Sequence, residues 1–318
     1  MSSGLASREN NFDLLRFVLS FIVFLVHAYV LSGAEALSVL TEFFSSKIAV
    51  ESFFVVSGFL IFMSYENTRV SQRYFVKRVR RIYPAYFFVI IASVVVGFFL
   101  SNSPWNDYFL GLLKYIAANL FFLNFLQPSL PGLFDNNIMQ AVNGALWILK
   151  IEVMFYLSVP FIVFAYGKLR RLPVLIGLYL LSACYSLLMD SLAIKTGSDF
   201  YLELQRQLPG QLTYFIFQSW LPLTFVEPVA LGVLVVYLAC VLPSLGHFGK
   251  YGDFSYGIYI LHFPILQVMV SYGLFGESPW VMLFVSGVFV IVGAIFLWHF
   301  IEKPFLAKSS HYVETTIE

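Results

Sequence analysis

Long stretches of apolar residues, almost free of Asp, Glu, Lys and Arg, run through this chain and leave few folds open to it. A helix needs about 20 such residues to cross the roughly 30 Å hydrocarbon core of a membrane. In lipid the backbone must satisfy its own hydrogen bonds, and these stretches lack the period-two alternation of β-barrel strands. We therefore predict an all-α, polytopic transmembrane bundle of about ten helices, with spans at 14–33, 46–65, 82–101, 108–126, 144–166, 172–190, 208–222, 225–243, 254–274 and 279–300.

The overall composition agrees with a membrane protein. Of the 318 residues, 59% are hydrophobic and only 12% are charged, whereas a soluble domain is about a quarter charged. This deficit excludes a disordered chain and argues against a soluble globule of this size, because too few polar residues remain to cover its surface. The 19 Lys and Arg against 18 Asp and Glu leave no basic excess, so we expect no nucleic-acid partner.

The cysteines and the known short motifs give no sign of a metal site. Cys184 and Cys240 each lie in an apolar stretch, and we interpret them as small buried hydrophobic residues, not as a disulfide or as metal ligands. The HExxH, phosphate-loop and GxSxG patterns do not occur in the chain. We expect no bound metal and no tightly held cofactor.

The chain is predicted to hold one membrane-embedded domain at 14–305. A cytoplasmic segment (1–13) precedes this domain, and a tail (306–318) too short for a further folded domain follows it. Residues 17–26 resemble the apolar core of a signal peptide, but the acidic residues ahead of them argue against cleavage. We interpret them as part of the first membrane span.

Basic residues set the predicted orientation. The densest cluster lies between the second and third predicted spans: Arg69, Arg73, Lys77, Arg78, Arg80 and Arg81. The positive-inside rule places this loop and the N-terminus in the cytoplasm, and we predict a multi-pass protein of the bacterial inner membrane. By the same rule a second basic cluster at 168–171 is predicted to be cytoplasmic. The segment 127–143 holds no Lys or Arg and is predicted to lie on the external side. Ten simple crossings cannot meet both demands, so either 108–126, which polar residues interrupt, is re-entrant or the rule fails locally.

Two ionisable residues of the first predicted span are candidate site residues, because a charge at mid-membrane costs at least about 2.5–3.5 kcal/mol. Arg16 and His27 are 11 residues apart. This is close to three helical turns, so both project from one face, roughly 16 Å apart along the axis. Asp13 precedes Arg16 by one turn and shares that face. Two simpler interpretations stay open: Arg16 snorkels to lipid phosphates, and His27 makes a structural hydrogen bond between helices.

The second and fifth predicted spans each carry a carboxylate. Glu51 needs a partner, for which we expect a histidine or arginine of a neighbouring span. Glu152 lies more than a turn deeper than Trp147, which fits an interfacial aromatic belt, and its simpler interpretation is a structural ion pair with another span. Ser57 and Gly58 mark a place where a helix or a ligand can approach closely, and helix packing is the simpler interpretation.

Further candidates lie at the start of the third predicted span and near the C-terminus. Arg78 and Arg81 suit a phosphorylated ligand, since a guanidinium binds phosphate bidentately, although a topology signal also explains their charge. Tyr259 and His262 are one turn apart on one face of the ninth predicted span. Glu302 ends the last span, where we expect an ordinary interfacial charge.

Six short motifs follow one another along nearly the whole chain, from about residue 11 to residue 305. They are DLLR at 13–16 with His27 after ten intervening residues, FFVVSGF at 53–59, RVRRIYP at 78–84, WILKIE at 147–152 followed by FY at 155–156, SYG at 255–257 with His262, and IEKP at 301–304. Each motif is weak alone, but the ordered set resembles the integral membrane proteins known as acyltransferase family 3. Lys150 stands where members of that family usually have a small or apolar residue.

The resemblance implies a fold and an activity. Such proteins look like a bundle of about ten helices that moves an acyl group, commonly acetyl, from cytoplasmic acyl-CoA. The usual acceptor is a hydroxyl of a lipopolysaccharide, exopolysaccharide, peptidoglycan or lipid-linked sugar. We therefore expect an O-acyltransferase with acetyl-CoA as its co-substrate, a sugar or polysaccharide acceptor and the lipid bilayer as its surroundings.

The chemistry of acyl transfer assigns hypothetical roles to the candidates. His27 is the expected base or transient acyl carrier, because its unperturbed pKa near 6.5 suits either role, and Glu152 or Glu51 orients its ring. Glu152 is the preferred partner of His27. The remaining candidates are expected to bind substrate: the arginines hold the CoA phosphates, and Ser57 or Tyr259 donates to the carbonyl oxygen. These residues are Arg16, Arg78, Arg81, Asp13, Ser57, Trp147, Tyr259 and His262.

A carbohydrate transporter or flippase is the alternative. Buried charges, proline-interrupted spans and many small residues also suit a carrier. The arginine cluster discriminates between the two classes, since an acyltransferase should bind CoA from the cytoplasmic side and release its free thiol, whereas a carrier should do neither.

Overall fold

The computed structural model describes residues 10–68, 71–197, 201 and 226–306, with residue 247 left out. All regular structure in this part of the chain is helical, as predicted. The helices are α1 (Phe12–Ser32), η1 (Glu35–Leu37), α2 (Val39–Phe43), α3 (Ser46–Thr68), α4 (Ser71–Leu100), α5 (Trp105–Leu120), η2 (Gly144–Leu146), α6 (Trp147–Lys168), α7 (Arg171–Thr196), α10 (Val226–Val236), η4 (Tyr237–Val241), η5 (Phe248–Tyr251), α11 (Ser255–Ser271), α12 (Pro279–Phe296), η6 (Leu297–Glu302) and η7 (Lys303–Phe305).

Among the described residues, five helical segments are long and apolar enough to cross a membrane. They are α1, α3, most of α4, η2 with α6, and α12 with the turns that follow it. The multi-pass membrane character is thereby confirmed, while the total of about ten helices stays a prediction. The predicted span at 208–222 lies outside the described residues.

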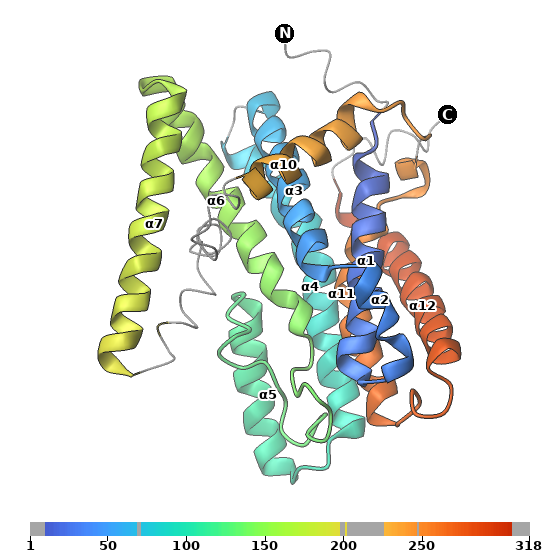
Figure 1. Cartoon of the computed structure of the whole chain (residues 1–318). Helices are drawn as coiled ribbons and strands as arrows, with labels where there is room; N and C mark the ends of the chain where they lie inside the picture. Colours follow the sequence, from blue (N-terminus) through green and yellow to red (C-terminus); the bar gives the residue numbers. More distant parts are fainter. Residues whose placement is uncertain (1–9, 69–70, 198–200, 202–225, 247, 307–318) are drawn as a thin grey trace.

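Helices α1, α3, α11 and α12 form the part of the bundle that positions the site (Figure 1). α1 packs against both α3 and α11, and α11 packs in turn against α12. Gly257 permits the α11–α12 contact, because a Cβ there would lie 2.8 Å from the Cα of Ala294. Ile258 and Val290, from the same two helices, are fully buried. The start of α11 is therefore fixed tightly against its neighbours.

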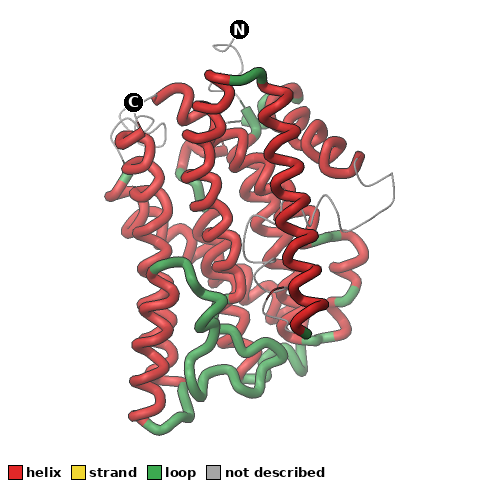
Figure 2. Tube along the Cα trace, turned by 90° about the vertical axis from the view of Figure 1, so that its left-hand side faces the viewer, coloured by secondary structure: helices red, strands yellow, loops and turns green. Residues whose placement is uncertain are grey.

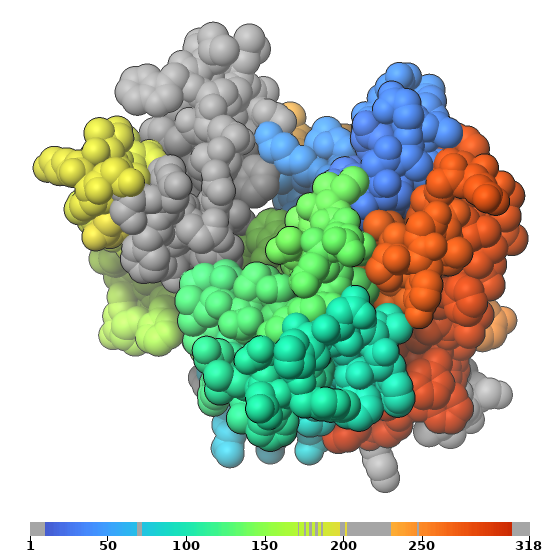
Figure 3. All heavy atoms as spheres, turned by 90° about the horizontal axis from the view of Figure 1, so that it is seen from below, coloured from blue at the N-terminus to red at the C-terminus, as the bar shows by residue number. Residues whose placement is uncertain are grey.

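α5 and the loop at 121–143 form a hairpin that starts and ends at the same end of the bundle. The 16 residues of α5 make a helix only about 24 Å long. The loop after α5 turns back toward the end of α4. There Ser101 Oγ donates to the Pro131 carbonyl (2.6 Å) and the Asn102 N–H donates to the Gly132 carbonyl (3.1 Å). The long loop of this hairpin lies at one end of the molecule in Figure 2, and the hairpin forms much of the face seen in Figure 3.

This hairpin removes the conflict between the two basic clusters. α4 runs down the bundle in Figure 1 and α6 runs up, so the basic start of α4 and the end of α6 at Lys168 share one end of the molecule. In the structure 108–126 is therefore not a simple crossing of the bundle, and this arrangement agrees with both basic clusters lying at one end. α4 begins at Ser71, about three turns earlier than predicted, so its arginines lie on a helix and Pro84 lies inside it.

The cysteines are one correction to the sequence analysis. Both are free thiols, but Cys184 is exposed on α7 and Cys240 is only partly buried. The apolar stretches that hold them predicted burial in protein. Hydropathy alone does not distinguish an apolar side chain buried in protein from one exposed on the surface of a helix bundle.

Candidate active site

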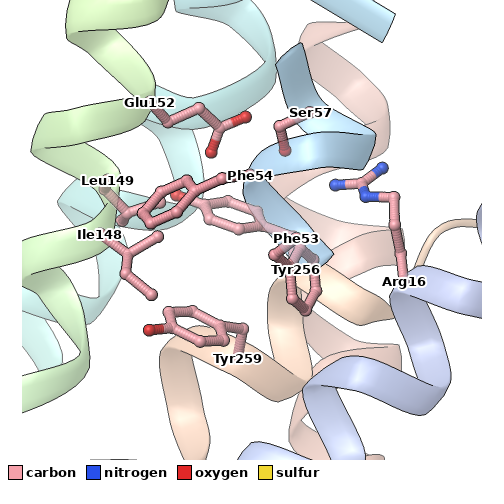
Figure 4. Close-up of a pocket in the computed structure, with 9 residues that line it drawn as sticks. All are labelled: Arg16, Phe53, Phe54, Ser57, Ile148, Leu149, Glu152, Tyr256 and Tyr259. Atoms are coloured by element: carbon pink, nitrogen blue, oxygen red, sulfur yellow. The ribbon is translucent and has the colours of Figure 1, made fainter. Parts of the chain in front are cut away.

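A narrow pocket lies between α1, α3, α6 and α11 (Figure 4). Its space is about 30 Å³, room for roughly two water molecules. Apolar and aromatic walls surround a few polar groups, and in Figure 4 the Glu152 carboxylate, the Ser57 hydroxyl and the Arg16 guanidinium lie around one side of it. The lining residues are Arg16, Phe53, Phe54, Ser57, Ile148, Leu149, Glu152, Tyr256 and Tyr259.

Arg16 belongs to a buried ion network with Asp253, Arg81 and Glu302. The Asp253 carboxylate accepts hydrogen bonds from both Arg16 and Arg81, and Arg81 also donates to Glu302 Oε2 (2.9 Å). The side chains of the two arginines are about 15% exposed, and Glu302 is fully buried. Buried charges of this kind need partners, and here two cations and two anions neutralise one another.

Two of these four residues correct the sequence analysis. Glu302 is not an ordinary interfacial charge, because η6 packs it inside the bundle against Arg81. Asp253 was missed altogether, since it lies in a short polar turn and not in an apolar span. The signal that could have found it is its place two residues before Ser255, where a carboxylate accepts from the first backbone N–H groups of a helix.

Local structure holds Asp253 in place. Gly252 before it has φ +130°, and a Cβ there would lie 2.2 Å from the Trp298 indole nitrogen, so only glycine lets this turn lie against η6. The Ser255 backbone N–H (3.1 Å) and hydroxyl both donate to Asp253. Burial raises the pKa of this carboxyl, but Arg16, Arg81 and the Ser255 hydrogen bonds outweigh burial and lower its pKa from 3.8 to about 2.

Arg78 has a different environment from Arg16 and Arg81. Its guanidinium lies over the rings of Tyr74 (5.7 Å) and Tyr156 (5.4 Å), a cation–π arrangement, and no carboxylate pairs with it among the described residues. The Tyr156 hydroxyl donates to Glu152 Oε1 (2.6 Å). Tyr156 thus connects the α4 arginine to the pocket carboxylate.

His27 pairs with His262 below the pocket. Nδ1 of His27 lies 2.7 Å from Nε2 of His262, and the two rings are stacked with centroids 5.0 Å apart. His262 is fully buried. The rings of Phe263 and His27 meet edge to face, with their centroids 5.8 Å apart. Arg16 and His27 therefore both face α11 and the turn before it, as the 11-residue spacing predicts.

Tyr259 separates the pocket from the histidine pair. It lines the pocket, and its ring lies 5.6 Å from that of His262, one turn further along α11. His27 itself is not among the lining residues. The pocket and the histidines therefore form two adjoining compartments along the α1–α11 contact.

The other candidates lie apart from this arrangement. Glu51 approaches Lys47 of its own helix (3.8 Å), and neither Asp13 nor Glu51 lines the pocket. Trp147 is half-buried against Phe54, with ring centroids 6.4 Å apart. No hydrogen bond joins Glu152 to His27 in the part of the chain that the structure describes, and the side chain that contacts His27 there is His262.

Gly58 makes no close helix contact among the described residues. Within that part of the chain a Cβ at Gly58 would meet nothing within 4 Å, whereas one at Gly257 would collide with α12. The simpler interpretation of the Ser57–Gly58 pair is therefore wrong for the glycine. Ser57 next to it lines the pocket instead.

Comparison with known proteins decides the family. The acyltransferase domain family matches residues 9–221, about two thirds of the chain. The chain belongs to acyltransferase family 3. The resemblance drawn from the six motifs is thereby confirmed.

Members of this family and related proteins indicate the kind of reaction. The chain is 24% identical to an O-acetyl transferase of Shigella phage Sf6, over 95% of this chain and 98% of the relative. Nodulation protein 10 of Rhizobium leguminosarum bv. viciae is 26% identical over 95% of this chain and 94% of its own length. A putative O-acetyltransferase of Staphylococcus aureus (strain COL) is 23% identical, and the alignment covers 81% of this chain but 52% of that relative. No solved structure gives a significant match.

The family and these relatives support an O-acyltransferase that works in a membrane with an acyl donor and a sugar acceptor. In this family member polar groups in a narrow pocket and a histidine pair beside it lie within one bundle.

Proposed function

We propose that the protein transfers an acetyl group from cytoplasmic acetyl-CoA to a hydroxyl of a cell-surface polysaccharide, lipopolysaccharide or lipid-linked sugar. The observation that carries this proposal is the pocket at the arginine end of α1, with His27, held by His262, about 16 Å further along the same helix. This distance is comparable to the length of an extended pantetheine arm, so a donor whose phosphates bind at the arginine end of the bundle can bring its thioester to His27. The O-acetyltransferase names of the relatives support acetyl as the group.

In the proposed reaction His27 is the general base. The acceptor oxygen attacks the thioester carbonyl, so that a C–O bond forms and the C–S bond breaks. Nε2 of His27 takes the hydroxyl proton and returns it to the CoA sulfur, which leaves as the free thiol. Ser57 and Tyr259 are the candidate donors to the negatively charged oxygen, since both line the pocket next to the histidines.

Among the three arginines first assigned to the CoA phosphates, Arg78 is the strongest candidate. Arg16 and Arg81 are each engaged by Asp253, whereas Arg78 is held only by tyrosine rings among the described residues. A cation without a carboxylate partner gains most from an incoming phosphate, because no existing ion pair must break first. Arg16 and Arg81 then support the site by fixing α1 and α4 to the start of α11.

The donor test uses membranes that contain the full-length protein and acetyl-CoA with a labelled acetyl group. We expect release of free CoA together with label in a saccharide product, and neither in membranes that lack the protein. Comparing surface glycans from cells with and without the gene by mass spectrometry then identifies the acceptor by a gain of one acetyl unit. A saccharide that crosses the membrane without acetylation, and with no release of CoA, would instead support the carrier alternative.

We further place the basic end of the bundle in the cytoplasm of a bacterium, with the N-terminus on that side. Both basic clusters at one end of the molecule support this orientation. In a background without Cys184 and Cys240, Gln72→Cys at the exposed start of α4 should react with a membrane-impermeant thiol reagent only after permeabilisation. Asn136→Cys, exposed in the hairpin loop, should react in intact spheroplasts, and the reverse pattern would invert the topology.

A further inference from the structure

The contact between the two histidines contains information about where the protons lie. His262 has two ring nitrogens with different neighbours: Nδ1 lies 3.2 Å from the Ile258 carbonyl one turn earlier, and Nε2 lies 2.7 Å from Nδ1 of His27. A carbonyl oxygen only accepts hydrogen bonds, so Nδ1 of His262 must carry a proton to make this contact. In a neutral imidazole the other nitrogen then has a lone pair, and Nε2 of His262 is an acceptor.

The same reasoning continues into His27. Since Nε2 of His262 accepts, Nδ1 of His27 donates, and the proton of neutral His27 is therefore on Nδ1. The lone pair of His27 lies on Nε2, the nitrogen that turns away from His262. This is the only neutral tautomer of His27 in which both contacts of His262 are satisfied, and it is the tautomer a general base needs.

Among the residues that the structure describes, His262 is the one polar side chain that contacts His27 and can fix this tautomer. The rings that face the pair are Tyr259 and Phe263, and no carboxylate or further cation contacts either imidazole in the described ranges. In a serine-protease triad a buried carboxylate orients the base, and there the wrong tautomer lowers kcat by about 10⁴-fold. Here a buried histidine, itself held by a helix carbonyl, stands in the place of the carboxylate.

We propose that His262 is a positioning residue that fixes His27 in the tautomer with its lone pair on Nε2. His262 itself does not touch either substrate. This inference rests on the proposed function only in taking His27 as the base. It changes the role of His262 from substrate binding, which its place on the Tyr259 face suggested, to orientation of the base.

The test compares three variants at position 262. His262→Gln can place its amide oxygen where Nε2 of the imidazole lies, whereas His262→Asn carries the same amide group but is too short to reach His27. His262→Leu removes the acceptor and keeps an apolar side chain of similar size. His299→Leu is the matched control, because His299 makes the same contact from Nδ1 to a carbonyl one turn earlier (Ile295, 2.9 Å) but is exposed and lies outside the site.

We expect His262→Asn and His262→Leu to lower kcat about 10²- to 10³-fold, with KM for acetyl-CoA within about threefold of wild type, because general-base catalysis contributes about 10²–10⁴-fold. His262→Gln should stay within about tenfold of wild type, and His299→Leu should match it. Monodisperse elution from detergent establishes that each variant is folded.

Three results separate the possible failures. Near-wild-type kcat in His262→Leu would overturn the inference while leaving the proposed function intact. Equal loss in the Gln and Asn variants would also overturn it, since only a packing role treats the two amides alike. If the wild-type protein releases no CoA from acetyl-CoA, the proposed function fails, independently of residue 262.

Discussion

The polar side chains in the two regions along α1 have opposite kinds of partner. At the upper end Arg16 joins Arg81, Asp253 and Glu302, and two positive charges meet two negative charges. Three turns deeper His27 meets only another imidazole and aromatic rings among the described residues. In the first region the charges pair with one another and hold the helices together. In the second region the lone pair on Nε2 of His27 remains available to accept a proton.

The difference separates structure from chemistry within one helix. A charged group inside a membrane bundle is most stable when an opposite charge saturates it, and it then has little capacity left for a substrate. A neutral imidazole is far cheaper to bury and keeps a lone pair that can act as a base. We therefore expect changes in the ion network to affect stability first, and changes at His27 to affect turnover first.

The largest expected effect is at His27. His27→Gln should lower acetyl transfer by at least about 10³-fold, because the amide cannot accept the hydroxyl proton. The same membranes should contain a normal amount of folded protein. Labelled acetyl-CoA and quantitative immunoblotting measure the two quantities, and His299→Gln serves as the control. Near-normal product from His27→Gln would remove His27 from the mechanism.

The ion network should show the converse pattern. Asp253→Asn leaves Arg16 and Arg81 without their shared carboxylate and should lower the free energy of unfolding by about 3–5 kcal/mol. Thermal unfolding in detergent measures this loss. Asp135→Asn, at an exposed position of the hairpin loop, should change the stability by less than about 0.5 kcal/mol. A stable but inactive Asp253→Asn protein would contradict the separation of the two regions.

Acid should weaken the ion network in a defined window. The pKa of Asp253 is lowered from 3.8 to about 2 in the folded protein. A lowered pKa means that the stabilisation is complete above about pH 4 and is lost as the pH falls toward 2, by about 2 kcal/mol in total. Thermal stability attributable to Asp253 should therefore be flat from pH 8 to 5 and decline below pH 4. In Asp253→Asn this contribution should be absent, and an equal decline in the variant would assign the acid effect to other groups.

The smallest effect is expected at Arg78. Arg78→Gln should raise KM for acetyl-CoA about tenfold, the equivalent of one charge-assisted hydrogen bond, with little change in stability. Arg80→Gln, the exposed neighbour on α4, is the matched control and should leave KM unchanged. Arg81→Gln should instead destabilise the protein, because Glu302 loses its partner. A raised KM in the Arg80 variant alone would move the phosphate site to the outer face of α4.

Much of the bundle is predictable from hydropathy, and part of the site from helical periodicity. The apolar stretches give the positions of α1, α3, α6, α11 and α12 to within a few residues, because burial in lipid demands a long uncharged helix. The 11-residue spacing correctly places Arg16 and His27 on one face. Neither result depends on knowing which helices are neighbours.

Contacts between helices could not be predicted in this way. Asp253 lies in a turn, and only the folding of α4 and α1 around that turn brings two arginines to it. The partner of His27 likewise depends on helix packing, because His262 lies on α11, and it is not the carboxylate expected. A single sequence gives the face of a helix but not the surface that this face meets.

The hairpin of α5 and its loop affects how many membrane crossings separate the four charged residues of the ion network. A segment that returns to the end from which it starts adds no crossing, and in Figure 1 the start of α1 and the end of α12 lie at the same end of the bundle. Lengthening α5 into a complete crossing would invert every later helix and leave Asp253 and Glu302 across the membrane from Arg16 and Arg81. The four charged residues can form their ion pairs only when an even number of membrane crossings separates them. A chain inserted with an odd number of crossings would leave Arg16 and Arg81 without their carboxylate partners.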